Sequence, residues 1–311
     1  MKVKVNQNLD KYKSLIGLVL LCLVITIVAP KFLTLSNITN VFTQVSVNAI
    51  IAVGMTFVIL TGGIDLSVGS TLAISGALGA SIVKSTGNIT LAVIVSALVG
   101  IGIGLINGLL ISKGKLQAFI ATLATMTIFR GVTLVFTNGT PISKLPEEFV
   151  KIGNGKIGFM PIPVIITIIV FLIGAYALSQ TRFGRYLYAL GGNEDSARLS
   201  GINTTKIKTL AYVISGFSAS VAGVIITSRI GSASPNAGTG FELDAIAAVV
   251  IGGTSLAGGE GRITGTIIGA LIIGVLNNGL NLMNVSPFYQ SIVKGLVILI
   301  AVLLDKKRNK K

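Results

Sequence analysis

The residues best suited to chemistry in this chain lie in a polar segment, residues 180–208, which reads QTRFGRYLYALGGNEDSARLSGINTTKIK. Within it, several residues suit the N-cap, the acidic first turn, the basic last turn and the position after the C-cap of a short helix. They are Asn193, Glu194, Asp195, Arg198 and Gly201. A helix of about two turns is marginal alone in water, so it needs a surface to lean on. We therefore predict that this segment is a docking site for another protein.

Catalytic and cofactor-binding motifs are missing from the sequence. The phosphate-binding loop of an ATPase ends in Gly-Lys-Ser/Thr, whereas the two Gly-Lys pairs here, at 114–115 and 155–156, are followed by Leu116 and Ile157. There is no histidine, and the one cysteine, Cys22, builds neither a disulfide framework nor a zinc site. We expect no enzyme activity, no metal site and no cofactor bound to this chain.

Polar side chains within or next to apolar segments can contact a neutral solute or hydrogen bond between helices. Asp65 is the acidic residue in the most apolar surroundings. It has two interpretations: it caps a helix that begins near Ser67, or it lies in a transport pathway. The candidate pathway residues are Asn48, Asp65, Asn107, Asn277, Asn278 and Gln290, with Asn281 a further amide nearby.

Long apolar segments must position these residues. Of the 311 residues 52% are hydrophobic and 11% charged, and the mean hydropathy is +0.87, whereas soluble domains carry about 25% charged residues. This composition predicts an all-α polytopic membrane protein. The apolar runs lie at 14–29, 45–61, 67–84, 91–112, 118–137, 162–179, 209–227, 242–257, 264–283 and 289–304. Most approach the roughly 20 residues that cross a bilayer, although the runs around 62–63 and 252–253 are alternatively broken or re-entrant helices.

The basic residues indicate the orientation. The net charge is +15, and Lys and Arg concentrate in both terminal segments and in the loops that ten spans place on the same side. The positive-inside rule assigns that side to the cytoplasm. We predict ten spans with both termini cytoplasmic, eight being the alternative. Residues 1–311 then form one transmembrane domain, with a helical bundle over 14–304 and a cytoplasmic loop at 180–208. Nucleic-acid binding is not expected, because it needs a continuous basic face in water.

Four charged residues form a second candidate site. Arg130 and Lys294 lie within predicted spans, and Glu242 and Asp244 begin another span on the same, outer side. Because lone charges are costly there, we predict that the four neutralise one another in an outer charge cluster. The cluster either holds the helices together or serves as an outer gate.

Two patterns indicate how the spans pack. Small residues recur every four positions, which lets helix backbones approach closely. They are Gly69, Ala73, Ala77 and Ser81; Gly100, Gly104 and Gly108; Ser215, Ala219 and Gly223; and Gly265 and Gly269. The motif Gly-Gly-x-x-Leu-x-x-Gly occurs at 62–69 and again at 252–259, and Asn-Gly-Leu occurs at 107–109 and 278–280. These matches predict two weakly repeated halves, which are typical of transporters.

Longer segments resemble a known family. GGIDLSVGS (62–70), YALGGNEDSARLSGI (188–202), ELDAIAAVVIGGTSLAGGEGRITGT (242–266) and NNGLNL (277–282) resemble the membrane-spanning permeases of bacterial ATP-binding-cassette importers for monosaccharides. The resemblance extends from about residue 46 to residue 305. Within the family, KGKLQAFIATL (113–123) and RGVTLVFTNGTP (130–141) are most similar to the members that import ribose.

The resemblance implies a permease in the bacterial plasma membrane that pairs with a second copy of itself. It also implies a cytoplasmic two-cassette ATPase subunit that uses the ATP and an extracytoplasmic protein that delivers the sugar. Residues 193–201 then correspond to the coupling helix, with Glu194, Asp195, Arg198 and Leu199 contacting the ATPase. Two alternatives remain open: a self-sufficient secondary sugar carrier, and the same kind of importer with another sugar, a nucleoside or a furanose-like cargo.

Overall fold

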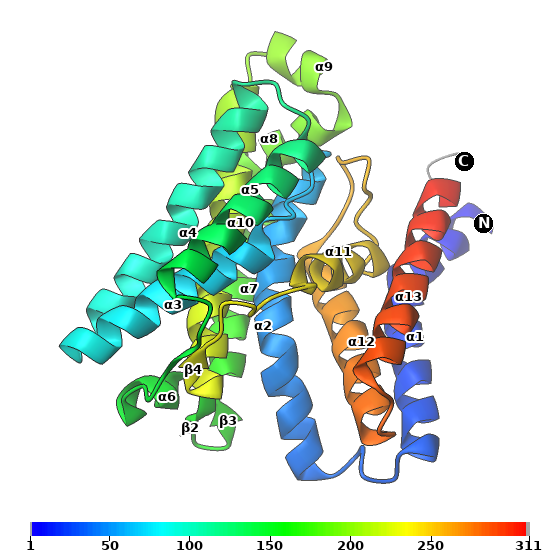
Figure 1. Cartoon of the computed structure of the whole chain (residues 1–311). Helices are drawn as coiled ribbons and strands as arrows, with labels where there is room; N and C mark the ends of the chain where they lie inside the picture. Colours follow the sequence, from blue (N-terminus) through cyan, green and yellow to red (C-terminus); the bar gives the residue numbers. More distant parts are fainter. Residues whose placement is uncertain (1, 309–311) are drawn as a thin grey trace.

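Helices make up nearly all of the chain (Figure 1). The computed structural model describes residues 2–308, and the side chains of residues 14–303. The helices are α1 (Lys2–Val28), α2 (Leu35–Leu60), α3 (Val68–Thr86), α4 (Ile89–Ser112), α5 (Ala118–Phe136), α6 (Glu147–Asn154), α7 (Ile162–Gln180), α8 (Arg182–Gly192), α9 (Glu194–Leu199), α10 (Thr204–Ile230), α11 (Phe241–Ile251), α12 (Ile263–Leu282) and α13 (Pro287–Arg308). The strands in this part of the chain form two short antiparallel pairs: β1 (Ile142–Ser143) with β4 (Ser232–Ala233), and β2 (Lys156–Ile157) with β3 (Met160–Pro161). The predicted all-α class is confirmed.

Asparagine side chains fix where several helices begin. Asn88 Oδ1 accepts a hydrogen bond from the Leu91 amide at 2.9 Å, and Asn203 Oδ1 accepts one from the Lys206 amide at 2.9 Å. Each bond satisfies an N–H group that the first turn of a helix leaves free. The apolar runs predicted at 91–112 and 209–227 therefore extend back to capped starts at Ile89 and Thr204, directly after the capping asparagines.

The helices run between two ends of the bundle (Figure 1). One end, which we call the α9 side, carries α8 and α9, and α1 begins and α13 ends toward it. The opposite end, which we call the α6 side, carries α6, β2 and β3. Both ends of the helical chain thus lie toward the same side as the polar segment.

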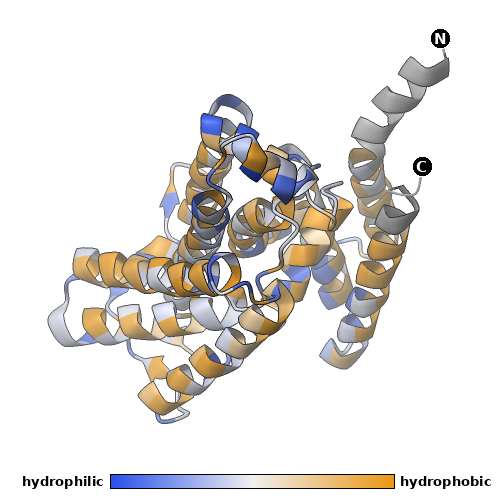
Figure 2. Cartoon of the chain, turned by 90° about the horizontal axis from the view of Figure 1, so that it is seen from above, coloured by the Kyte–Doolittle hydropathy of each residue, from blue (hydrophilic) through white to orange (hydrophobic). Residues whose placement is uncertain are grey.

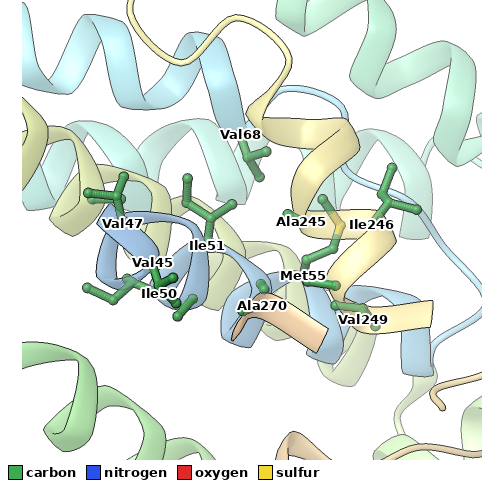
Figure 3. Packing of buried hydrophobic residues seen from close by; sticks show 14 of the residues in the cluster. Val45, Val47, Ile50, Ile51, Met55, Val68, Ala245, Ile246, Val249 and Ala270 are labelled. Carbon is green, nitrogen blue, oxygen red and sulfur yellow. The ribbon is translucent and has the colours of Figure 1, made fainter. Parts of the chain in front are cut away.

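The most apolar helices lie on the outside of the bundle. The most apolar windows of α4 and α7 have mean hydropathies of 2.6 and 2.5, and 28% and 17% of them is buried. α2 reaches only 1.8, yet 83% of its window is buried. Lipid is as apolar as a leucine side chain, so two of the outer helices, α4 and α7, carry the strongest hydropathy, although the outer helix α5 reaches only 1.7 (Figure 2). The core forms around α2, where Met55 packs with Val249 of α11 and Ala270 of α12 (Figure 3).

Six described helices are long and apolar enough to cross a membrane: α2, α4, α5, α7, α10 and α12. α1 and α13 contain shorter apolar stretches, Ser14–Val28 and Pro287–Leu303. The prediction of a continuous span over 242–257 is wrong, because α11 ends at Ile251 and has 11 residues. Such a helix rises roughly 16 Å, about half of the hydrocarbon core. α11 lies midway between the two sides of the bundle (Figure 1).

Glycine allows α4 and α10 to touch backbone to backbone. A Cβ atom on Gly104 would collide with the carbonyl oxygen of Tyr212, and one on Gly108 would lie 2.7 Å from the Thr209 Cα. Neither neighbour is a flexible side chain that could move aside. The close packing predicted from the spacing of small residues in α4 is therefore confirmed.

This contact predicts a clear difference between two glycines of α4. Gly104→Ala should lower the free energy of unfolding by about 1–3 kcal/mol, because the added methyl group overpacks the interface with α10. Gly102→Ala is the matched control, since a Cβ there meets no described atom within 4 Å. Thermal unfolding of the purified protein in detergent measures both. Equal melting temperatures for the two variants would contradict this packing.

Candidate translocation and coupling sites

The predicted helix in the polar segment exists and is capped as expected. Asn193 Oδ1 accepts a hydrogen bond from the Ser196 amide at 2.8 Å. At the other end Gly201 has a φ of +82°, and its N–H donates to the Arg198 carbonyl at 3.0 Å. A positive φ is a conformation that glycine adopts without steric cost. Both local predictions are confirmed, and α9 stands out from the bundle (Figure 1).

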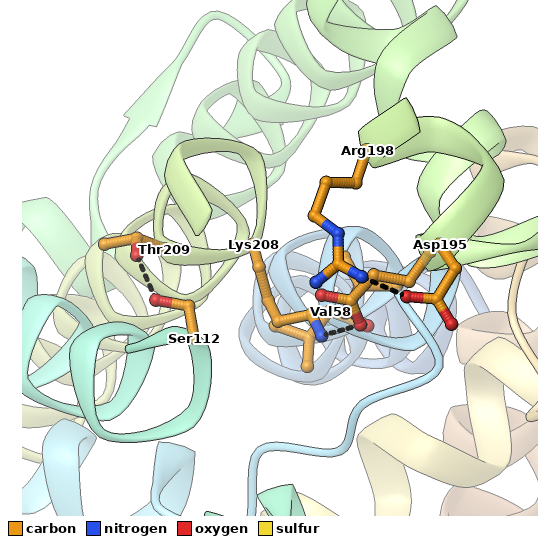
Figure 4. Close-up of polar contacts among 8 residues, drawn as sticks. Val58, Ser112, Asp195, Arg198, Lys208 and Thr209 are labelled. Carbon is orange, nitrogen blue, oxygen red and sulfur yellow. Dashed lines mark hydrogen bonds and ion pairs between the residues drawn. The ribbon is translucent and has the colours of Figure 1, made fainter. Parts of the chain in front are cut away.

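The residues expected to contact a partner divide into two groups. Asp195 and Arg198 form an ion pair of 2.7 Å with side chains that are 78% and 60% exposed, and Leu199 is 87% exposed. Glu194 instead turns toward α10, where its Oε2 lies 2.6 Å from Lys208 Nζ (Figure 4). The outer face of α9 therefore offers one charge pair and one apolar side chain, and Glu194 holds α9 to the bundle.

A cavity of about 280 Å³ lies beside this Glu194–Lys208 pair. Its walls come from the turn after α2, the connection between α4 and α5, and α10. They include Thr61, Gly62, Gly63, Lys115, Leu116 and Tyr212. Among the described residues, no group of three or more acidic, histidine or cysteine side chains is arranged to hold a metal ion. The cavity thus lies between α9 and the loop that follows α2, which contains Gly62 and Gly63.

Asp65 lies at the centre of a buried polar network. Its Oδ1 accepts hydrogen bonds from the Ser67 amide at 3.0 Å and the Ser67 hydroxyl at 2.6 Å, and its Oδ2 accepts one from the Ser215 hydroxyl at 2.8 Å. Asn107 Nδ2 donates to the Ser67 hydroxyl at 2.8 Å. Ser67 is itself the N-cap residue of α3, and no side chain accepts a hydrogen bond from the first turn of this helix, so Asp65 braces the turn before α3 and is not its cap. The carboxylate bonds directly to Ser215 of α10, and Ser67 links it to Asn107 of α4, so the network joins the start of α3 to both helices.

The four charged residues of the predicted outer cluster form two pairs of opposite charge, Lys294 with Asp244 and Arg130 with Glu242. Lys294 Nζ lies 3.0 Å from Asp244 Oδ2, and Asn48 Nδ2 donates to the same oxygen at 3.4 Å. Arg130 interacts electrostatically with Glu242. The two hydrogen bonds described for the Arg130 guanidinium go to backbone carbonyls, those of residues 235 and 237, at 2.6 and 2.9 Å. Arg130 therefore stabilises the non-helical segment that leads into α11.

The remaining candidate pathway amides lie near the α6-side half of α12. Asn278 and Asn37 exchange two hydrogen bonds of 2.9 Å between α12 and α2. Gln290 donates to Asn281 Oδ1 at 2.8 Å and closes the turn between α12 and α13. Asn277 Oδ1 is buried and has no hydrogen-bond partner among the described atoms. The six candidates thus belong to three separate groups of contacts, and their role in a pathway stays a prediction.

Several partners of these sites were missed from the sequence. The sequence places Ser215 only in a pattern of small residues, and it marks Lys208 only as the last residue of the polar segment 180–208. Asn37 lies in a segment that was not predicted as helix. Ser215 and Asn37 bond to residues 150 and 241 positions away, and Lys208 to one in another helix 14 positions away, so no helix-periodic pattern marks them.

The Asp244–Lys294 pair predicts a strong effect of removing one partner. Asp244 is 4% exposed, so Lys294→Met leaves a buried carboxylate without its cation. We expect a loss of about 3–5 kcal/mol in stability, with less folded protein in the membrane. The double variant Lys294→Met with Asp244→Asn should recover most of this loss, because it removes the charge as well. Folded yield and melting temperature report both effects, and a Lys294→Met protein as stable as the parent would rule out the pair as a stabilising contact.

Comparison with known proteins identifies the family. The family described as "Branched-chain amino acid transport system / permease component" matches residues 37–302. Ribose import permease proteins of Escherichia coli (strain K12) and Bacillus subtilis (strain 168) are 55% and 54% identical to this chain, covering 97% of it and 95% and 94% of the relatives. The D-allose transport system permease protein of Escherichia coli (strain K12) is 43% identical over 97% of this chain and 93% of its own length. No solved structure gives a significant match. These relatives are named as permeases and not as enzymes, and the chain belongs to this family of membrane permease components.

Proposed function

We propose that this chain is the permease subunit of an ATP-binding-cassette importer that moves ribose into the cytoplasm. The observation that carries the proposal is identity of 53–55% to ribose import permeases over nearly the whole chain. Identity falls to 43% for the D-allose permease and to 37% for the L-arabinose permease. The gradient favours ribose over other sugars as the cargo.

We further propose ten crossings with the α9 side in the cytoplasm. The segment from β4 through α11 to the loop before α12 counts as one crossing that is only partly helical. Non-helical backbone is tolerated at membrane depth when protein satisfies its polar groups, and Arg130 supplies two such bonds. The loops on the α9 side carry Lys113, Lys115, Arg182 and Arg185 as well as the basic residues around α9, in agreement with the positive-inside rule.

The outer face of α9 is the proposed contact for a cytoplasmic ATPase. Its exposed residues are Asp195, Arg198 and Leu199. ATP binding and hydrolysis on that partner would displace α9, and two copies of this permease would rock around a pathway between them. An extracytoplasmic protein would supply high affinity for the sugar. Polar contacts within the pathway are then weak, because tight binding there would slow release.

The transport reaction tests this function directly. Vesicles containing this chain with its ATPase subunit should accumulate labelled ribose only when the sugar-binding protein and ATP are both present. Accumulation without ATP would instead indicate a secondary carrier. Unlabelled D-allose, L-arabinose and a nucleoside serve as competitors, and equal competition by all of them would remove the assignment to ribose.

The proposed role of α9 predicts loss of coupling without loss of fold. Arg198→Glu combined with Leu199→Asp should reduce ribose uptake by about tenfold and weaken copurification of the ATPase, because both exposed contacts change. Glu194 is left intact, since it contacts Lys208 within the chain. Lys156→Glu combined with Ile157→Asp, on the exposed turn at the α6 side, is the charge-matched control. Full uptake by the double variant, at an unchanged melting temperature, would show that α9 does not dock the ATPase.

A further inference from the structure

Three short segments from different parts of the chain meet next to α9 with no side chain between them. They are residues 60–62 at the end of α2, residues 257–259 between α11 and α12, and Gly191 in the last turn of α8. We call them together the glycine junction. The Gly259 N–H donates to the Leu60 carbonyl at 3.0 Å, so the loops that follow α2 and α11 are hydrogen-bonded to each other.

The backbones at the glycine junction are too close to admit a side chain. A Cβ atom on Gly191 would collide with the Leu60 carbonyl oxygen and with the Gly259 nitrogen. A Cβ atom on Gly258 would lie 2.8 Å from the Gly62 nitrogen and 3.1 Å from the Gly191 oxygen. Backbone atoms cannot turn aside as the end of a long side chain can. If one of the three segments moves, the other two must therefore move with it.

The end of α8 is also fixed to the second loop by a side chain. Tyr188 Oη donates to the Gly261 carbonyl at 2.8 Å. Burial raises the pKa of this phenol, with a smaller opposing effect of Arg262, so the hydroxyl is protonated at neutral pH and can donate. Leu187 and Leu190 of α8 are buried in the bundle. These contacts make α8 and the loop before α12 one packed unit.

α9 follows this unit after a single residue. α8 ends at Gly192, α9 begins at Glu194, and the side chain of Asn193 between them caps α9. On its other side α9 is held by the Glu194–Lys208 pair, which lines the same cavity as Thr61 and Gly63 of the first loop. Because only Asn193 separates α9 from α8, a displacement of α9 is passed directly to α8 and to the loops that contact it, residues 60–62 and 257–259.

The two loops carry the repeated Gly-Gly-x-x-Leu-x-x-Gly motif, at 62–69 and 252–259. The first leads into the Asp65 network before α3. The second leads into α12, where a Cβ on Gly265 would collide with the Gly252 carbonyl. Each loop therefore controls how the next long helix is placed. Contact between them means that both helices receive the same displacement.

We propose that the glycine junction transmits the movement of α9 to both repeated loops during transport, with Gly191 as the positioning residue. The inference rests on the proposed function, because it assumes that a partner moves α9. Packed interfaces of this kind shift between discrete arrangements and do not deform gradually. A methyl group at Gly191 holds the segments apart and breaks the transmission, while the exposed face of α9 keeps its partner contacts.

The test compares neighbouring glycines in the reconstituted complex of this chain, its ATPase and the sugar-binding protein. Gly191→Ala should lower the number of ribose molecules imported per ATP hydrolysed by about tenfold, with hydrolysis and ATPase copurification retained. Gly192→Ala is the matched control, because a Cβ there meets no described atom within 4 Å, and its ratio should equal that of the parent. A parental ratio in Gly191→Ala would overturn the proposal.

A second variant covers the case in which Gly191→Ala does not assemble. Tyr188→Phe removes one hydrogen bond to the second loop and adds no atom, and it should lower the same ratio by about fivefold. A parental ratio in Tyr188→Phe, or a parallel loss of hydrolysis and uptake with a lower melting temperature, would show that the junction only supports the fold. If the parent complex imports no ribose with ATP, the proposed function is wrong. If the parent complex imports ribose and Gly191→Ala imports it equally well, only the proposed role of the glycine junction is wrong.

Discussion

Lipid offers no hydrogen-bond partner, so each peptide group that leaves a helix at membrane depth needs a partner within the protein. The chain meets this constraint with a small number of buried polar side chains. Arg130 donates to two carbonyls of the segment before α11. Asp65 accepts from the amide that precedes α3 and from two hydroxyl groups. The breaks in the helices, which a transporter needs in order to move, depend on these residues.

The same environment explains why small residues and not large ones hold the bundle together. Between helices in lipid, burial of apolar side chains gains little, because the acyl chains are equally apolar. Close approach of backbones then supplies the packing energy. α4 and α10 meet at Gly104 and Gly108, and α11 and α12 meet where a Cβ on Gly269 would collide with the Ala248 carbonyl. The central helix α2 is less apolar than the outer helices α4 and α7.

The cytoplasm-facing end of the proposed transporter separates two tasks within one short stretch of chain. Asp195, Arg198 and Leu199 point away from the bundle and are available to a partner. Glu194 and Gly191 face inward, the first against Lys208 and the second against the backbones of both glycine loops. A six-residue helix that lacks stability of its own is thus held by contacts on its inner side.

The membrane class, the all-α architecture, the family and the caps of α9 could all be predicted from the sequence. Helix formation and helix capping depend on residues within one or two helical turns, as Asn193 and Gly201 show for α9, so neighbouring residues in the sequence are enough to predict them. The limits of the sequence appear at α11, whose apolar run looked long enough to cross but whose helix stops at Ile251. The tertiary structure alone decided that Lys294 binds Asp244, that Glu194 binds Lys208 and that the candidate pathway amides fall at three places. These pairings join side chains of different helices, and only the packed bundle fixes how those helices lie relative to one another.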